Sequence, residues 1–380
     1  MRILIISAFD PLPGDEQLLI RYPYVAQALC ELGAEVDYVS SRFFHGKKRM
    51  RDAGNMYAEL PYHVHLLPAI SYGKNVSLGR LQHHAHFAKQ LKLFLDKQAP
   101  YSLIISAFPP IEANHVVQQY ATKTGTPWIV DIQDAWPQAF YNSIGGQGIG
   151  KLATFPLLRK ARNAIHAATA RFAVSKDYFD LYECEGQAFP LGISEVKFSD
   201  SEIDFEKAPN SKVLLFMGSS GQTPFLQKLT RAWGEQAPSD CHLVLAGAAD
   251  WIKKLQTRPE QRFWVYPQAV PSQSLLQVAD IGLVTPDPSL LSRMPFKVFG
   301  YLSEGLSLMT NIQGGELERW LSEHQLGLSF DNSLEGFWTK LKKLNPDTDD
   351  KTRIRTWANR SLSKSTVYRQ YAEAALTFAV

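Results

Sequence analysis

Apolar runs rich in isoleucine and valine alternate with amphipathic stretches along the first half of the chain. The apolar runs have the length of buried strands and read RILIISAF, EVDYVSS, YSLIISAF, PWIVDIQD and ARFAVS. Helical patterns such as LIRYPYVAQALCELG and IEANHVVQQYATKTG separate them, and Gly33 and Gly125 stand where a glycine caps the C-terminus of a helix. This alternation is typical of parallel strands covered by helices on both faces of a sheet.

The second half repeats this alternation. It begins with KVLLFMG and the helical pattern PFLQKLTRAWGEQ, followed by HLVLAG, WVYPQA, SLLQVA, DIGLVT and LSLMTN. The stretch between the halves, SEVKFSDSEIDFEKAPNSK, is polar, acidic and poor in periodicity, as in an interdomain linker. The pattern predicts an α/β protein of two doubly wound Rossmann-like domains facing a central cleft. We expect a first domain over 1–195, a linker over 196–211, a second domain over 212–360 and a C-terminal helix over 361–380 that can cross back to the first domain.

Length, charge and cysteine content narrow the class of protein. A chain of 380 residues exceeds the roughly 250–300 residues at which a single core stops growing. The formal net charge of +3 gives no global attraction to nucleic acid, so we expect no nucleic-acid partner. Cys30, Cys184 and Cys241 lack CxxC spacing, which argues against a disulfide framework and a zinc site. With no leader and no transmembrane window visible, we expect a cytoplasmic protein.

Two further motifs suggest metal binding at first sight. In HHAH, residues 83–86, only His83 and His86 share a helical face, which favours a solvated or packed role. The Asp-Thr-Asp at residues 347–349 follows Asn-Pro in a polar stretch with no preceding strand, which favours a helix start. We therefore expect no metal site.

Glycine-rich loops follow the first strand of each predicted domain. Ligands of open α/β sheets bind beyond the carboxyl ends of the strands, where such loops can bring peptide N–H groups and hydroxyls close to an anion. The segment DPLPGDEQ follows the first strand, and GSSGQT follows the first strand of the second domain. A tight strand-to-helix connection gives the same pattern. As donor-binding candidates in these loops and after the next strand we take Gly14, Gly218, Ser219, Ser220, Gly221 and Gly247.

The order of these segments, together with PFKVFGYLSEG and GGELERWLSEHQLG, resembles the retaining nucleotide-sugar glycosyltransferases with the GT-B fold, glycosyltransferase family 4. The similarity runs from the first strand to about Gly327. It implies transfer of a sugar from a nucleotide-diphosphate donor, UDP- or GDP-linked, with retention at the anomeric carbon and without a metal or other cofactor. It also implies that the donor binds mainly the second domain and the acceptor the first.

In the resemblance, Lys297 falls on the lysine that grips the donor diphosphate. Preorganised positive charge at a departing diphosphate lowers the barrier to breaking the glycosidic bond. Arg293, four residues earlier, can add a bidentate contact to phosphate oxygens, although a solvated basic face is the simpler structural alternative. The resemblance extends the donor-binding candidates to Tyr301, Gly315 and Glu316.

Two positions depart from the family pattern. Gly300 stands where the family has a glutamate that binds the donor ribose, and its earlier acidic partner falls at Ser292, so this clamp is missing or supplied elsewhere. Many relatives have a histidine at Gln133, and a neutral amide can hydrogen-bond to a sugar but is not a base. Front-face retention tolerates that change, because the leaving phosphate can take the acceptor proton. Asp134 either orients the acceptor or caps the next segment.

The basic run HGKKRMR, His45 to Arg51, follows two phenylalanines. Such a loop can rest on anionic lipid, which would place the protein peripherally on the inner face of the membrane, beside a lipid-linked acceptor. An ordinary exposed loop is the alternative. We thus expect a hexosyltransferase-type enzyme of surface-polysaccharide assembly that acts on a glycan or lipid-linked glycan. Two alternatives remain open: a catalytically silent relative that binds glycan or stabilises a partner glycosyltransferase, and a nucleotide-sugar epimerase on the same fold.

Overall fold

The computed structural model divides the chain into two compact units. Unit 1 comprises Met1–Gly192 with Lys364–Val380, and unit 2 comprises Ile193–Ser363. The structure describes residues 1–15, 20–52, 55–75, 77–138, 146–193, 207–218, 223–267, 273–287 and 294–380. Most of the expected linker, 196–206 of 196–211, therefore lies outside the described residues.

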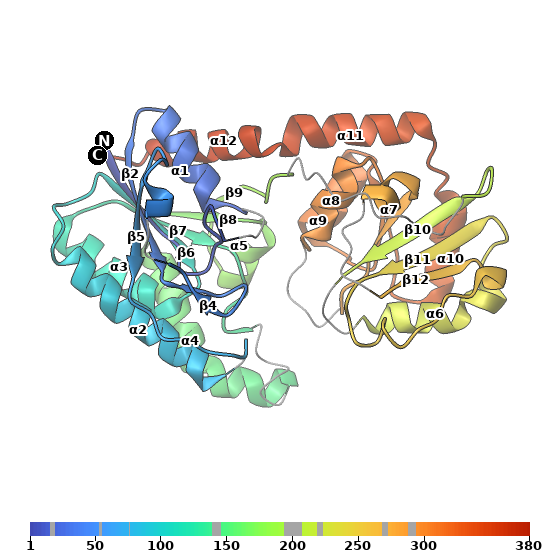
Figure 1. Ribbon diagram of the computed structural model, residues 1–380, viewed down its shortest axis with the longest axis horizontal. Coiled ribbons are helices and arrows are strands. Elements are labelled where there is room, and N and C mark those ends of the chain that lie inside the picture. The colour runs from blue at the N-terminus through green and yellow to red at the C-terminus, as the bar shows by residue number, and fades with distance from the viewer. Residues whose placement is uncertain are drawn as a thin grey trace. The chain divides into compact units, whose positions relative to one another are not determined.

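A seven-stranded sheet forms the centre of unit 1 (Figure 1), in the order β5-β2-β1-β6-β7-β8-β9. All its strands are parallel. The chain order reverses direction between β1 and β6, which creates a switch point at the carboxyl ends of these two strands. The strands are β1 (Arg2–Ile6), β2 (Glu35–Ser41), β5 (His63–Leu67), β6 (Leu103–Phe108), β7 (Trp128–Ile132), β8 (Ala170–Ala173) and β9 (Gln187–Ala188), with a separate hairpin of β3 (Phe43–Phe44) and β4 (Arg49–Met50).

Helices cover both faces of this sheet, as its continuous apolar strands require. Helices α2, α3 and α4 lie on one face and α1 and α12 on the other (Figure 1). Gly125 ends α3 in the left-handed conformation, as predicted. Gly33, also predicted as a cap, follows the C-cap residue of α1 with a positive φ. The helices are α1 (Tyr22–Glu31), α2 (Leu78–Leu95), α3 (Ile111–Thr124), α4 (Gly146–Ala167), α5 (Asp177–Tyr182) and α12 (Lys364–Leu376), and a short η1 turn spans Asn55–Tyr57.

The last helix belongs to the core of unit 1. The Tyr371 hydroxyl on α12 donates a hydrogen bond of 3.0 Å to the Asp131 carboxylate of β7. That carboxylate also accepts from the Arg21 guanidinium at 2.7 Å, with both side chains fully buried. The Tyr368 hydroxyl donates to the carbonyl of Ile20 at 2.6 Å. Because buried charges need partners, this network fixes α12 against α1 and the sheet.

Unit 2 has a second parallel sheet, six strands in the order β12-β11-β10-β13-β14-β15. Its switch point falls between β10 and β13. The strands are β10 (Lys212–Met217), β11 (Cys241–Ala246), β12 (Phe263–Tyr266), β13 (Ile281–Val284), β14 (Ser307–Thr310) and β15 (Gly327–Ser329). The helices are α6 (Pro224–Gln236), α7 (Gln273–Val278), α8 (Lys297–Ser303), α9 (Gly315–Glu323), α10 (Leu334–Lys343) and α11 (Thr348–Leu362), with a short η3 turn at Pro259–Gln261.

The predicted fold class, α/β with two Rossmann-like domains, is confirmed by these two sheets. The predicted helix start at the Asp-Thr-Asp motif is also confirmed, because the Asp347 side chain caps α11 by accepting from the amide of Asp350 at 2.8 Å. Within the described residues, no group of histidine, cysteine, aspartate or glutamate is placed to hold a metal ion. None of the helices in that part of the chain combines the length and apolarity of a membrane span.

Candidate functional site

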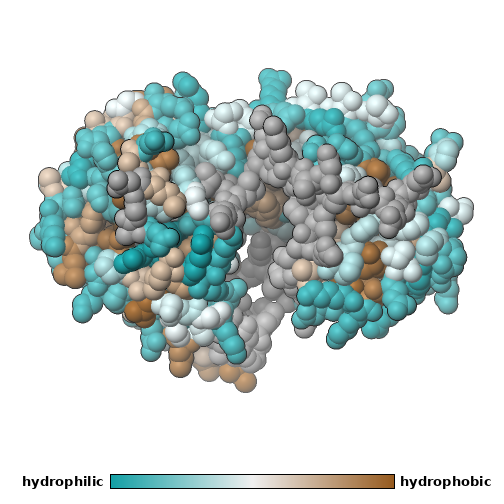
Figure 2. Space-filling view, viewed as in Figure 1, coloured by the Kyte–Doolittle hydropathy of each residue, from teal (hydrophilic) through white to brown (hydrophobic). Residues whose placement is uncertain are grey.

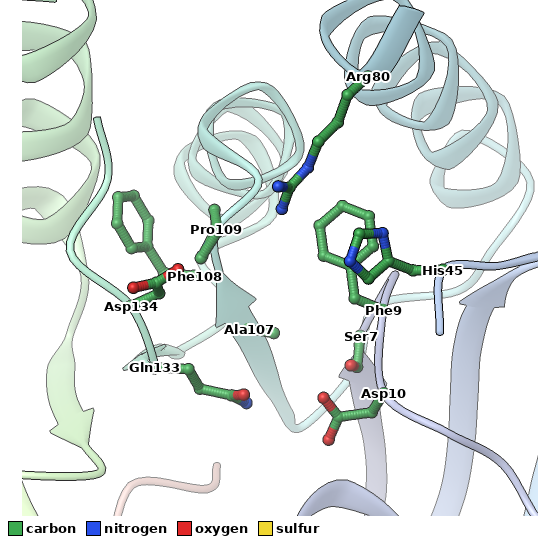
Figure 3. A pocket seen from close by; sticks show the side chains of 10 residues that line it. All are labelled: Ser7, Phe9, Asp10, His45, Arg80, Ala107, Phe108, Pro109, Gln133 and Asp134. Carbon is green, nitrogen blue, oxygen red and sulfur yellow. The ribbon is translucent and has the colours of Figure 1, made fainter. Parts of the chain in front are cut away.

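A pocket of about 280 Å³ lies at the carboxyl ends of the central strands of unit 1 (Figure 3). It falls at the switch point beside β1 and β6, where an open parallel sheet places ligands. Both predicted acceptor-side residues, Gln133 and Asp134, line it. The lining residues are Ser7, Phe9 and Asp10 after β1, Ala107, Phe108 and Pro109 at the end of β6, Gln133 and Asp134 after β7, and His45 and Arg80.

Two carboxyl groups in this pocket are held away from water. Burial raises the pKa of Asp10 to about 6, and the Tyr22 amide donates a hydrogen bond of 3.4 Å to one of its carboxylate oxygens. Burial also raises the pKa of Asp134, which accepts from the amide of Ala135 at 2.8 Å. A carboxyl that titrates near neutral pH can exchange a proton with a substrate hydroxyl. Asp10 was missed by the sequence analysis, although it directly follows the apolar run RILIISAF.

Gln133 and Arg80 give the pocket its hydrogen-bond donors. In Figure 3 the Gln133 amide and the Asp10 carboxylate point toward each other across the pocket, and Arg80 reaches in from α2. The Gln133 side-chain nitrogen is buried and has no hydrogen-bond partner within the described residues. Arg80 lies 4.8 Å from the centroid of the Trp136 ring, and burial lowers its pKa. A pocket that brings hydrogen-bond donors and acceptors together suits a polyhydroxylated ligand.

An aromatic and histidine wall closes another side of the pocket. Phe9 packs against His45 and His84, with ring centroids 5.4 and 5.2 Å apart. Burial lowers the pKa of His45 to about 3, so its ring is neutral at pH 7. His83 and His84 are both fully buried, whereas His86 is partly exposed. Of the solvated or packed role expected for HHAH, the packed one holds for His83 and His84, both of which α2 turns inward.

Part of the basic run at residues 45–51 is built into unit 1, whereas Arg49 and Met50 are exposed. Arg51 is buried and binds the Asp15 carboxylate at 2.7 Å and the carbonyl of Asp10 at 2.9 Å. Lys48 donates to the Asn75 side chain at 2.7 Å, while Lys47 remains exposed. This clamp fixes the turn that carries Gly14. Gly14 has a φ of +89°, a conformation that favours glycine, so the turn itself explains the residue.

In unit 2, the predicted donor-side residues Gly218, Gly247 and Lys297 come together at the end of β10. The Lys297 ammonium lies 3.7 Å from the centroid of the Phe216 ring and 3.2 Å from where a Cβ on Gly218 would stand. A Cβ on Gly247 would lie 1.8 Å from the Gly218 carbonyl oxygen, so the two loop backbones pack in direct contact. Ser219, Ser220, Gly221, Ser292 and Arg293 lie outside the described residues.

Burial lowers the pKa of Lys297 to about 7. In the part of unit 2 that the structure describes, no carboxylate pairs with this ammonium. A desolvated ammonium without a counter-charge is stabilised by an incoming anion. The carboxyl end of β10 can therefore bind an anionic ligand.

Helix α8 is fixed behind Lys297 by Tyr301. This fully buried side chain accepts a hydrogen bond of 2.8 Å from the Met217 amide, and its ring fills the space over Gly282. Tyr301 thus positions α8 instead of lining open space. A Cβ on Gly300 would meet no atom within 4 Å, so packing does not require this glycine.

The other predicted donor residues, Gly315 and Glu316, lie in the first turn of α9. Gly315 has a φ of +79°, and Glu316 is only 5% exposed. Next to them, the Gly314 amide donates a hydrogen bond to the Glu318 side chain, which also accepts from Ser329. Glu316 is therefore a buried residue in the first turn of a helix, where negative charge is favourable.

No family model and no curated protein sequence matches the chain, whereas many solved structures share its fold. Sucrose-phosphate synthase from Thermosynechococcus elongatus is 13% identical, with a TM-score of 0.66 over 99% of this chain and 98% of that chain. The catalytic domain of starch synthase IV from Arabidopsis thaliana, bound to ADP and acarbose, is 12% identical, with a TM-score of 0.64 over 99% of each chain. HepE from Anabaena in complex with UDP is 15% identical, with a TM-score of 0.60 over 99% of this chain and all of that chain. The likeness establishes the GT-B fold.

Proposed function

We propose that the chain is a glycosyltransferase that moves a sugar from a nucleotide-diphosphate donor, UDP- or GDP-linked, to a glycan or lipid-linked glycan. The reaction retains the anomeric configuration, needs no metal and serves surface-polysaccharide assembly at the cytoplasmic side of the membrane. The GT-B fold over nearly the whole chain supports a nucleotide-sugar donor, since similar structures bind UDP or ADP. The proposal rests on the Lys297 ammonium, which has no carboxylate partner in the part of unit 2 that the structure describes.

Lys297 supplies the charge that the departing diphosphate needs. Its ammonium stands at the carboxyl end of β10, beside the backbone of Gly218. Binding of a diphosphate there restores the full charge of a lysine whose pKa is about 7 in the free protein. As the glycosidic bond breaks, the charge on the diphosphate grows, so the same contact is stronger in the transition state than in the ground state.

The pocket of unit 1 receives the acceptor hydroxyl. Gln133 donates a hydrogen bond to it, and Asp134 and Arg80 orient neighbouring hydroxyls. In a retaining reaction the leaving phosphate takes the acceptor proton, so Asp10 acts by accepting a hydrogen bond. In an inverting reaction, Asp10 would instead be the base, since burial raises its pKa to about 6. NMR of the anomeric proton of the product, made by wild type and by Asp10→Asn, distinguishes these two outcomes.

A second candidate function is a silent GT-B relative that binds glycan or stabilises a partner glycosyltransferase. The open space beside Gly300 favours it, because the carboxylate that the resemblance places there is absent. The two functions predict different behaviour toward donors.

Thermal shift and donor hydrolysis with a panel of UDP- and GDP-sugars test the proposal. We expect at least one donor to raise the melting temperature and to be turned over slowly in water. Glycan binding without any donor effect would instead support the silent relative. Release of a free isomerised sugar would identify an epimerase.

A further inference from the structure

The outer face of helix α4 in unit 1 is apolar in its first half. On its inner face the helix buries Thr154, Leu158 and further small and apolar residues, and it packs against α3. On the opposite side Ile149, Leu152 and Phe155 are 68%, 79% and 58% exposed. They are spaced three residues apart, so they project from adjoining turns. Three large apolar side chains so exposed on neighbouring turns mark a surface that binds something.

The same outer face becomes basic in the second half of α4. Arg159 and Lys160 are exposed one to two turns beyond Leu152 and Phe155, and Lys151 is exposed between the apolar residues. Helix α4, Gly146–Ala167, contains no aspartate or glutamate. The face therefore combines exposed apolar side chains with positive charge along one helix. Glu112 of α3 interacts electrostatically with Lys160, so Lys151 and Arg159 contribute most of this charge.

We propose that this α4 face, made of Ile149, Lys151, Leu152, Phe155, Arg159 and Lys160, docks the protein on an anionic lipid membrane. The apolar side chains enter the boundary between headgroups and acyl chains, and the cations meet lipid phosphates. Charge complementarity favours an anionic membrane over a symmetric dimer, because a second copy of the chain would place its own positively charged α4 face against this one. Figure 2 shows the apolar side chains in brown at the tip of α4, which Figure 1 draws at the lower edge of unit 1.

The basic run at residues 45–51 is less suited to this contact. Its Arg51 is tied to Asp15, and the two aromatic residues before it, Phe43 and Phe44, are buried. The run exposes one large apolar side chain, Met50, beside Lys47 and Arg49, whereas α4 exposes three such side chains beside its cations. This docking goes beyond sugar transfer and does not depend on it, because vesicle binding needs neither donor nor acceptor.

Flotation of the full chain with vesicles tests the proposal, using phosphatidylcholine alone or mixed with phosphatidylglycerol. We expect binding to the mixed vesicles, weakened by salt. Lys151→Gln/Arg159→Gln should weaken it about 30-fold at low salt, at about 1 kcal/mol for each cation. Leu152→Ser/Phe155→Ser should weaken it by at least about tenfold, since both side chains leave water on docking.

Two matched variants serve as controls. Leu93→Ser removes another exposed apolar side chain, 48% exposed on α2, and Lys47→Gln/Arg49→Gln removes the exposed cations of the basic run. Both should bind mixed vesicles like wild type, and circular dichroism should show every variant folded. Equal binding by the α4 variants and wild type, or loss confined to Lys47→Gln/Arg49→Gln, overturns the proposal. So does a wild type that ignores vesicles but forms a dimer that Leu152→Ser/Phe155→Ser dissociates.

Discussion

Arg21 in unit 1 and Lys297 in unit 2 are both held away from bulk water, but the fold treats their charges differently. Arg21 binds both oxygens of Asp131, at 2.7 and 3.0 Å, and the carbonyl of Phe189 at 2.6 Å. Burial alone would lower its pKa, but the Asp131 carboxylate raises it above the usual value. Lys297 has only an aromatic ring as its partner among the described residues, and burial lowers its pKa to about 7.

The presence or absence of a counter-charge distinguishes a buried cation that stabilises the fold from one that can bind a ligand. A charge that the fold neutralises completely contributes to structure, and breaking the pair is costly. A charge left without a counter-ion costs stability in the free protein, and an anionic ligand recovers that cost. Arg21 ties the returning helix α12 to the sheet of unit 1, whereas Lys297 stands at the ligand end of the sheet in unit 2.

The largest effect should come from removing the partner of Arg21. Asp131→Ala leaves a buried guanidinium without a carboxylate, so we expect the free energy of unfolding of unit 1 to fall by about 3–5 kcal/mol. Chemical denaturation followed by circular dichroism measures this loss. As a control, Asp350→Ala breaks an exposed pair with Arg353 and should change stability by less than about 1 kcal/mol. Equal effects of the two variants would contradict a structural role for the Arg21 pair.

Removing Lys297 should affect catalysis and leave the fold intact. We expect Lys297→Ala to lower turnover of the donor by a factor corresponding to about 3–4 kcal/mol, the value of one preorganised donor at a developing negative charge. The melting temperature should stay the same or rise, because a desolvated charge is removed. Lys342→Ala, at an exposed position on α10, is the matched control. If Lys297→Ala unfolds the protein, Lys297 belongs to the scaffold after all.

The pH dependence of nucleotide binding sharpens the same comparison. Only the protonated form of Lys297 attracts a diphosphate, and its pKa is about 7 in the free protein. As the pH rises above 7, the free ammonium loses its proton, so the association constant of UDP or GDP should fall by up to about tenfold per pH unit. Isothermal titration calorimetry measures this slope. Lys297→Arg keeps its charge throughout this range and should remove the slope, whereas a flat profile in wild type would rule out Lys297 as the phosphate cation.

The sequence predicted the two sheets well because continuous Ile- and Val-rich strands have no other stable place than a covered parallel sheet. It could also locate Gln133 and Asp134, which directly follow such a strand. The sequence did not predict that Arg80 and His45 line the same pocket. They come from α2 and from a loop, and only the folded chain places these two segments beside β1. The sequence also did not predict that Arg51 is buried, since its orientation depends on the carboxylate of Asp15, 36 positions away.

The smallest effect concerns Gly300, four residues into the seven-residue helix α8. A Cβ there meets no atom within 4 Å, so Gly300→Ala should stabilise unit 2 by up to about 1 kcal/mol through helix propensity alone. Thermal denaturation measures the gain, and UDP or GDP titration shows whether the open space is used. Unchanged nucleotide affinity in Gly300→Ala means that the donor leaves the space beside Gly300 empty. In that case Gly300→Glu should strengthen nucleotide binding by about tenfold through charge-assisted hydrogen bonds to the ribose. Loss of affinity in Gly300→Ala would instead mean that the donor itself fills this space, so the glycine marks a difference in donor shape and not a lost function.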